Sequence, residues 1–152
     1  IVRNTPPLGW ILGDEGSGAY IGRRLVGNLL KGLYDEELRR LFFEEERITY
    51  DEIIRRVYRE GMGNRFLASF TRFAARHIDR PEIEELICDA FRTLVRRNLA
   101  RYPADAEVSA LGGVAFSFER QLRRVLEAEG RRVGCIAESP DEGLSNYHIW
   151  KK

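Results

Sequence analysis

The sequence predicts an α/β protein with an all-helical middle part, and two observations carry this prediction. The last third of the chain alternates strand-like and helix-like stretches, the order found in a layer of an α/β sheet. The middle, about residues 35–102, repeats apolar residues at helical spacing. We therefore expect one α/β lobe over residues 1–152 that is interrupted by a helical insertion and binds its ligands at the strand ends.

The N-terminal part is predicted to place a loop before an amphipathic helix. Ile1-Val2-Arg3 is typical of the end of a strand, so we expect the chain to be part of a longer protein. A proline-rich turn and Trp10-Ile11-Leu12 lead into the glycine-rich residues 13–18. Ser17 is a suitable N-cap for a helix that Gly32 would end. The apolar side of this helix consists of Tyr20, Ile21, Leu25, Leu29 and Leu30.

Four further helices are expected in the middle of the chain. A short helix at about 35–43 comes first. Thr49 and Glu52 then fit the capping-box pattern and open a helix that a Gly-Met-Gly run ends. Pro81 suits the first turn of a long amphipathic helix that ends near Tyr102. The helix between these two carries Phe66, Leu67, Phe70, Phe73 and Ala74 at helical spacing.

The last third is predicted to be strand, helix, strand and helix. Residues 108–111 are typical of a short buried strand, and the glycine pair 112–113 turns it into a helix. Residues 133–137 form the next short strand, and a final short helix is expected over 142–150. The helix between the strands carries Phe116, Phe118, Leu122, Val125 and Leu126.

Composition and charge are those of a soluble globular protein. Hydrophobic residues make up 43% and charged residues 32% of the 152 residues. Lys and Arg number 25 against 24 Asp and Glu, which gives a net charge of +1. We therefore expect neither nucleic acid nor a membrane as a partner. No stretch approaches the ~18 consecutive apolar residues of a membrane span.

The cysteines and histidines predict no metal site within this chain. Cys88 falls in an apolar helix stripe and Cys135 in a strand-like run, so we expect both to be buried, without a disulfide. Two cysteines without a disulfide are typical of a protein in the reducing cytoplasm, which we take as the default compartment. His77 and His148 lie far apart and lack metal-ligand spacing.

The glycine-rich residues 13–18 are the most informative stretch. A glycine-rich loop before a helix often binds phosphate, but Asp14 and Glu15 would repel it and no Lys of the P-loop type is present. Carboxylates on a tight loop are better suited to accept hydrogen bonds from sugar hydroxyls. Trp10 would then offer an apolar face to the sugar ring. The alternative is that the carboxylates cap the helix and Trp10 belongs to the core.

The glycine pair 112–113 is a second candidate. Glycines between a strand and a helix let the backbone approach a flat ligand such as adenine without a Cβ clash. Such a turn can equally serve only to lead the chain into a helix.

Taken together, these motifs resemble a known family. Gly9-Trp10 before residues 13–18, the glycine pair 112–113 and the closing residues 139–144 are similar to the N-acetylglucosamine kinase and BadF/BadG/BcrA/BcrD ATPase family over essentially the whole chain. The resemblance implies the C-terminal lobe of an actin-like ATPase (hexokinase and heat-shock ATPase) fold. It also implies ATP and Mg²⁺ between two lobes, and transfer of the ATP γ-phosphoryl group to an amino sugar such as N-acetylglucosamine.

The resemblance also implies which residues bind the ligands. The sugar contacts would be Gly9, Trp10, Asp14 and Glu15. The adenosine contacts would be Gly112, Gly113 and Ser117. The family's phosphate loops and its proton-accepting aspartate do not occur here, so catalytic residues and most Mg²⁺ contacts are expected in an N-terminal lobe outside this chain. We therefore expect the fragment alone to be inactive, and its uncovered interlobe face to favour homodimers.

Two other functions stay open. The first is an ATPase that activates a CoA-ester reductase or dehydratase. Such activators hold an iron–sulfur cluster with closely placed cysteines, which the positions of Cys88 and Cys135 do not favour. The second is a non-catalytic sugar-sensing or interaction module that keeps the fold but not the chemistry.

Overall fold

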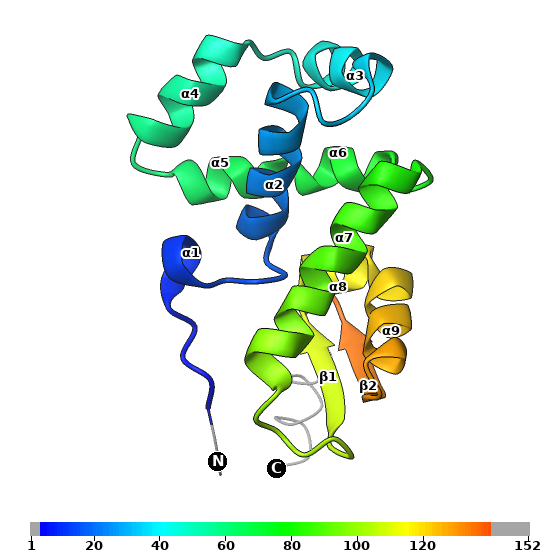
Figure 1. Ribbon diagram of the computed structural model, residues 1–152. Helices are drawn as coiled ribbons and strands as arrows, with labels where there is room; N and C mark the ends of the chain where they lie inside the picture. The colour runs from blue at the N-terminus through cyan, green and yellow to red at the C-terminus, as the bar shows by residue number, and fades with distance from the viewer. Residues whose placement is uncertain (1–3, 141–152) are drawn as a thin grey trace, which may run out of the picture.

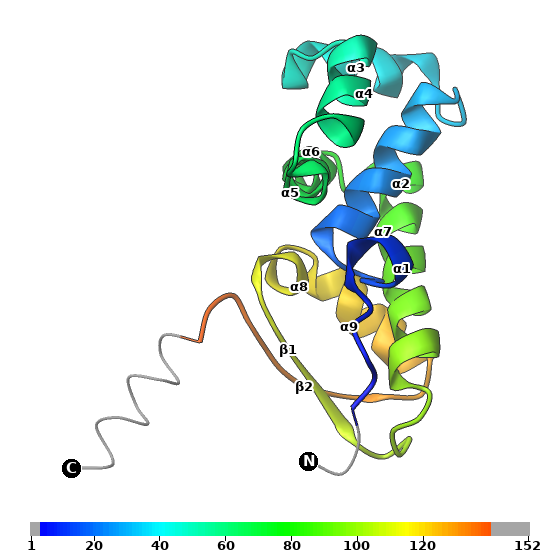
Figure 2. The same cartoon turned by 90° about the vertical axis from the view of Figure 1, so that its left-hand side faces the viewer.

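The computed structural model describes residues 4–140, so the strand end predicted at 1–3 and the helix predicted at 142–150 lie outside the described residues. A group of packed helices adjoins a smaller part with a two-stranded parallel sheet (Figures 1 and 2). The first part contains α1 (Gly9–Leu12), α2 (Gly18–Leu30), α3 (Glu36–Glu46), α4 (Tyr50–Tyr58), α5 (Gly63–Ser69), α6 (Thr71–Arg76) and α7 (Pro81–Leu94). A π-helical turn, η1 (Val95–Leu99), continues α7, and β1 (Glu107–Leu111), α8 (Gly113–Ser117), α9 (Glu119–Ala128) and β2 (Arg132–Ala137) follow.

Helix α2 begins and ends where the sequence predicts. Ser17 Oγ accepts a hydrogen bond from the Tyr20 backbone N–H at 3.1 Å, which confirms Ser17 as the N-cap. Ile21 and Leu25 on the inner face are fully buried. Gly32, just beyond the helix, has a φ of 66°, the left-handed conformation common after helices.

Local capping also starts the next two helices. The Leu38 backbone N–H donates to Asp35 Oδ1 at 2.6 Å before α3. The predicted capping box of α4 is confirmed, because Thr49 Oγ1 accepts from the Glu52 N–H at 3.3 Å while Glu52 Oε2 accepts from the Thr49 N–H at 2.9 Å. Side-chain oxygens thus satisfy backbone donors that the first helical turn leaves without partners.

The single helix predicted around Phe70 is in fact two helices, α5 and α6, which meet at that residue. Ser69 Oγ donates to the Phe66 carbonyl at 2.7 Å, and Thr71 Oγ1 donates to the Ala68 carbonyl at 2.8 Å. These hydroxyls compete with the backbone for helical carbonyls, which favours an interruption at this point. Apolar spacing alone did not reveal it.

The helix predicted after the glycine pair is also divided, at Phe118, into α8 and α9. Phe118 itself leaves the helical conformation, with φ −118° and ψ 32°. Because the chain turns there, Phe118 reaches the core with 1% of its surface exposed. Phe116, predicted on the same buried side, is 47% exposed.

The core is formed mainly by the helical part. Phe42 of α3 packs against Phe70 and Phe73 with ring centroids 5.1 Å apart in each case, and Phe66 lies 4.9 Å from Phe70. The rings meet at tilted or edge-to-face angles, the arrangement that aromatic quadrupoles favour. The phenylalanine stripe is therefore core. No helix within residues 4–140 has the length and apolar character needed to cross a membrane.

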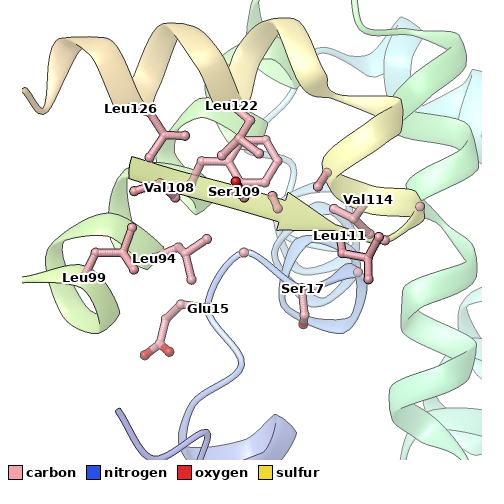
Figure 3. Close-up of a pocket in the computed structure, with 17 residues that line it drawn as sticks. Glu15, Ser17, Leu94, Leu99, Val108, Ser109, Leu111, Val114, Leu122 and Leu126 are labelled. Atoms are coloured by element: carbon pink, nitrogen blue, oxygen red, sulfur yellow. The ribbon is translucent and has the colours of Figure 1, made fainter. Parts of the chain in front are cut away.

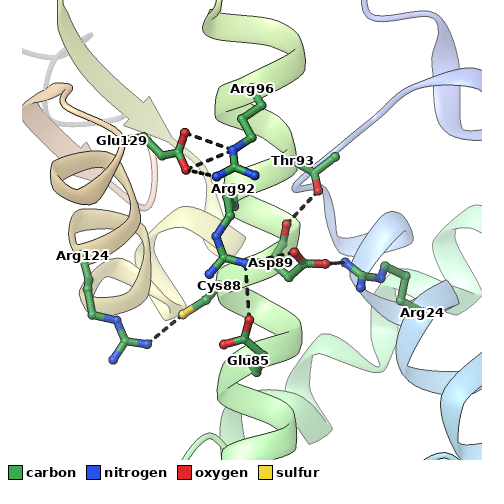
Figure 4. A network of polar contacts seen from close by, with 9 residues as sticks. All are labelled: Arg24, Glu85, Cys88, Asp89, Arg92, Thr93, Arg96, Arg124 and Glu129. Carbon is green, nitrogen blue, oxygen red and sulfur yellow. Dashed lines mark hydrogen bonds and ion pairs between the residues drawn. The ribbon is translucent and has the colours of Figure 1, made fainter.

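Helix α7 connects the two parts of the molecule through ion pairs (Figure 4). Arg24 Nη1 of α2 lies 2.6 Å from Asp89 Oδ2, an ion pair without the angles of a hydrogen bond. In η1, which continues α7, Arg96 Nη2 donates to Glu129 Oε1 at 2.8 Å, directly after the end of α9. All four side chains are partly exposed, so such pairs orient the helices more than they stabilise them.

The small sheet pairs β1 and β2 in parallel, with Leu111 opposite Ala137. The register shifts between Val108 and Ala110, where Ser109 Oγ accepts a hydrogen bond from the Cys135 backbone N–H at 3.2 Å. A side chain thus takes the place of a backbone partner at the irregularity.

The strands are less buried than predicted. Exposed and partly buried residues alternate along β1, and Leu111 at its end is 58% exposed. Cys135, predicted to be buried, is exposed, whereas Cys88 in α7 is buried as predicted; both are free thiols. Within residues 4–140 the helices lie along one face of the sheet (Figure 2), and Val133 and Ile136 of β2 pack against the core, whereas Cys135 between them does not.

Candidate functional site

The glycine-rich loop holds Asp14 in an unusual backbone conformation. Asp14 has a φ of 67°, a left-handed value that Asp tolerates better than most residues. Its Oδ2 accepts a hydrogen bond from Ser17 Oγ at 2.7 Å, and its carbonyl accepts one from the Ser17 N–H at 3.0 Å. Because Ser17 Oγ also accepts from Tyr20 N–H, the Asp14 carboxylate is tied to the first turn of α2.

Two of the other three residues predicted to contact a sugar, Gly9 and Trp10, lie before Asp14 on α1. Gly9 is exposed with a φ of 72°, and a Cβ built on it would meet no atom within 4 Å. Trp10 is partly buried and packs against the hydrophobic core. Part of the indole therefore belongs to the core, as the alternative interpretation of the sequence predicted for Trp10.

Glu15 points to a different part of the molecule. Arg97 Nη1 donates to its Oε1 at 3.1 Å, and Asn98 Nδ2 donates to its Oε2 at 3.3 Å. Only 8% of the Glu15 side chain is exposed. Burial raises the pKa of this carboxyl, but hydrogen bonds from its own backbone N–H, Asn98 and Arg97 outweigh burial and leave the pKa below its ordinary value.

The second glycine-rich turn connects β1 to α8. Gly112 has φ 127° and ψ 159°, a conformation that is essentially restricted to glycine. Its N–H donates to the Ala137 carbonyl at 2.9 Å, and its own carbonyl accepts from the Phe116 N–H at 3.1 Å. Gly113 is the first residue of α8, and a Cβ on either glycine would meet no atom within 4 Å.

One pocket of about 510 Å³ lies between the two glycine-rich turns (Figure 3). Glu15 to Gly18 contribute one wall, and β1 with the Gly112-Gly113 turn contributes another. The apolar side chains of the lining are Phe91, Leu94, Leu99, Val108, Ala110, Leu111, Val114, Ala115, Leu122 and Leu126. Gly16, with φ 78°, packs so closely on Leu94 that a Cβ would lie 3.0 Å from Leu94 Cδ2.

The structure thus brings together Glu15, Gly112 and Gly113 of the predicted contacts. Gly9, Trp10 and Asp14 precede the part of the loop that lines the pocket, and Ser117 lines a separate depression with Thr71 and Phe118. Leu94 and Leu99 are pocket residues that sequence reasoning missed. Their apolar spacing assigned them to a helix stripe, and no local pattern marks a helix residue as facing a distant loop.

The lining has a clear chemical character. None of its seventeen residues is Lys or Arg, and its one carboxylate, Glu15, is directed at Arg97 and Asn98. Apolar walls with a glycine turn suit a flat, uncharged ring system and would not neutralise a phosphate. Within residues 4–140, no three His, Cys, Asp or Glu side chains stand close enough to hold a metal ion.

This mainly helical fold with a small parallel sheet is that of a kinase-like fragment. It matches the crystal structure of the putative N-acetylglucosamine kinase from Porphyromonas gingivalis, with 43% sequence identity and a TM-score of 0.93, over 96% of this chain. The chain spans 52% of the length of that protein and corresponds to its C-terminal portion. No protein-family model and no curated protein matches the chain. The resemblance to N-acetylglucosamine kinases is therefore confirmed.

Proposed function

We propose that this chain is the C-terminal lobe of an ATP-dependent sugar kinase with an actin-like ATPase fold. The full-length protein would transfer the ATP γ-phosphoryl group to a hydroxyl of an amino sugar such as N-acetylglucosamine. One observation carries the proposal, the 43% identity and TM-score of 0.93 to the Porphyromonas gingivalis protein over 96% of this chain.

The geometry of Asp14 supports a role in binding the sugar. Its carboxylate is oriented by the Ser17 hydroxyl, which is itself fixed by the Tyr20 N–H. A pre-oriented carboxylate can accept hydrogen bonds from neutral hydroxyls without first losing rotamer freedom. Gly9, exposed and without a side chain, allows a ligand to approach the backbone beside it. In this proposal Trp10 packs partly on the core and partly against the sugar ring.

The apolar pocket supports a role in binding the adenosine part of ATP. Gly112 and Gly113 would let the adenine ring lie against backbone, with Leu94 and Leu99 on another side. Ser117, one helical turn further, would contact the outer part of the nucleoside. Because this lining has no basic side chain and its one carboxylate, Glu15, is bound to Arg97 and Asn98, the triphosphate and Mg²⁺ would be held mainly by the N-terminal lobe. When bound, Mg²⁺ would neutralise charge on the transferred phosphoryl group.

The proposal is tested by coupled ADP release from the full-length protein with N-acetylglucosamine, with glucose and without sugar. We expect release that depends on the amino sugar and falls at least about 100-fold in kcat/KM in Asp14→Ala, since a lost charged ligand misplaces the reacting hydroxyl. Asp79→Ala, which removes an exposed carboxylate in the turn before α7, is the matched control. Sugar-independent release would favour an activator-type ATPase, and no release would favour a non-catalytic sugar-sensing module.

A further inference from the structure

The π-helical turn η1 contacts the chain on both sides of Gly9, Trp10 and Asp14, three of the four residues predicted to bind the sugar. The Asn98 backbone carbonyl accepts a hydrogen bond from Thr5 Oγ1 at 2.8 Å, before Gly9. The Asn98 side-chain amide donates to Glu15 Oε2 at 3.3 Å, directly after Asp14. One residue of η1 therefore binds both ends of the segment that carries Gly9, Trp10 and Asp14.

The place of Asn98 at the end of η1 explains why its carbonyl can take an outside partner. The last turn of a helix leaves its carbonyls without donors inside the helix, and η1 ends at Leu99. The end of this helix is also held from the sheet side. Arg131 Nη2 donates to the Leu99 carbonyl at 2.9 Å and Arg131 Nη1 to the Pro103 carbonyl at 2.9 Å. The loop is thus attached to a firmly held helix end.

The contacts of Glu15 are those of an anchor. Both of its carboxylate oxygens already accept hydrogen bonds, one from Arg97 and one from Asn98. In Figure 3 the carboxylate points away from β1 and hence from the opposite wall of the pocket. With the side chain 8% exposed, releasing it toward a sugar hydroxyl would break charged hydrogen bonds at a nearly buried site.

We propose that Glu15 is a positioning residue, which acts through Asn98 and Arg97 of η1 to hold the loop that presents Asp14, and that it does not bind the sugar itself. The role in sugar binding rests on the function proposed above. The anchoring itself does not, because it follows from the contacts of Thr5, Glu15 and Asn98 alone. An experiment can therefore refute the anchoring of the loop without refuting the sugar-kinase function, and the reverse.

Hydrogen–deuterium exchange of the full-length protein tests the anchor without any reaction. In Glu15→Ala, amides 9–16 should exchange about tenfold faster or more, while α2 beyond its first turn is unchanged. Arg97→Ala, which removes one donor to Glu15, should act in the same direction, and Arg96→Ala is its matched control, since Arg96 is as exposed as Arg97, at 64% against 68%, but binds Glu129. If Glu15→Ala does not fold, Asn98→Ala replaces it, and amides 9–16 should exchange faster in that variant as well. Unchanged exchange of amides 9–16 would overturn the proposal.

Kinetics of the same variants distinguish an anchor from a ligand. For an anchor, Glu15→Ala should raise the KM for the sugar about tenfold with a smaller change in kcat, and Glu15→Gln, which keeps an acceptor oxygen, should lie between it and the wild type. An effect as large as that of Asp14→Ala, with normal exchange of the loop, would instead make Glu15 a direct ligand and overturn the proposal. If the wild-type protein shows no sugar-dependent turnover, the proposed sugar-kinase function is refuted. The hydrogen–deuterium exchange of amides 9–16 then still tests whether Glu15 holds the loop.

Discussion

Gly22 of α2 lies directly against the backbone carbonyl of Leu67 in α5, so closely that a Cβ on residue 22 would overlap the carbonyl oxygen. The two helices therefore cross backbone to backbone at this point. Gly22 is buried, and its neighbour Ile21 is fully buried. A helix interior normally disfavours glycine, so its presence here is explained by the close approach.

We expect Gly22→Ala to destabilise the chain by about 3 kcal/mol, because α2 and α5 must separate or bend to admit one methyl group. Gly27→Ala is the matched control on the same helix, where a Cβ would meet no atom within 4 Å. That substitution should stabilise the chain by up to about 1 kcal/mol through helix propensity. Urea unfolding measures both changes. Equal effects of the two substitutions would contradict the packing described for Gly22.

A second pair of glycines tests the proposed nucleotide site. Gly112→Ala should strain the turn by about 1–3 kcal/mol, because its φ of 127° and ψ of 159° suit glycine only. The strained turn would shift relative to the pocket, so we expect a higher KM for ATP in the full-length protein. Gly113→Ala, at the first position of α8, should change the KM for ATP less. If both variants keep the wild-type KM, the turn does not hold the nucleotide.

Local patterns allowed much of the fold to be predicted. The capping box of Thr49 and Glu52 and the cap at Ser17 involve residues three positions apart, so sequence alone identifies them. The two short strands and the helical stretch between them were predicted from the same kind of pattern, and the structure adds that the strands pair in parallel. The interruption at Phe70 was not predicted, because it depends on hydroxyls that bond to carbonyls one turn back.

Contacts between residues far apart in the sequence could not be predicted from local patterns. The contact of Glu15 with Arg97 joins residues 82 positions apart, and no spacing rule connects them. The exposure of Cys135 depends on which elements cover each face of the sheet, whereas strand propensity reports only that a strand forms. For the candidate site, the two glycine-rich turns were identified separately. Their common pocket is completed by Leu94 and Leu99, whose side chains gave no local signal of a pocket.

Glu45 predicts a pH-dependent contribution to stability. Its Oε1 bonds to His77 Nε2 at 2.8 Å and its Oε2 accepts from Arg76 Nη2 at 2.9 Å, which joins α3 to α6. Burial raises the pKa of Glu45, but the hydrogen bonds from Arg76 and His77 lower it by more than burial raises it. The pKa of this carboxyl therefore lies below its ordinary value. The folded chain then binds fewer protons here than the unfolded chain. The contribution is present above about pH 4.3 and is lost as the pH falls through the folded pKa.

We therefore expect Glu45→Gln to lower the free energy of unfolding at pH 7 by about 0.5–1 kcal/mol, a modest value because Arg76 is half-exposed. The difference in stability from wild type should shrink as the pH falls below about 4.3 and through the folded pKa of Glu45. Glu44→Gln is the control, since Glu44 pairs with Arg40 on the exposed surface of the same helix. Urea unfolding at a series of pH values gives both curves, and a difference that stays constant down to pH 3 would refute the linkage.

The two thiols should differ sharply in reactivity. Cys135 is exposed on β2, whereas Cys88 is 2% exposed and its Sγ accepts a hydrogen bond from Arg124 Nη2 at 2.8 Å (Figure 4). Because a labelling reagent reaches Cys88 only after local opening of the contact between α7 and α9, its reaction should be much slower. Titration of the native chain with an aromatic disulfide should show one fast thiol, and the urea-unfolded chain two. In Cys135→Ser the fast phase should vanish, and a fast phase that persists there would mean that α9 does not cover Cys88.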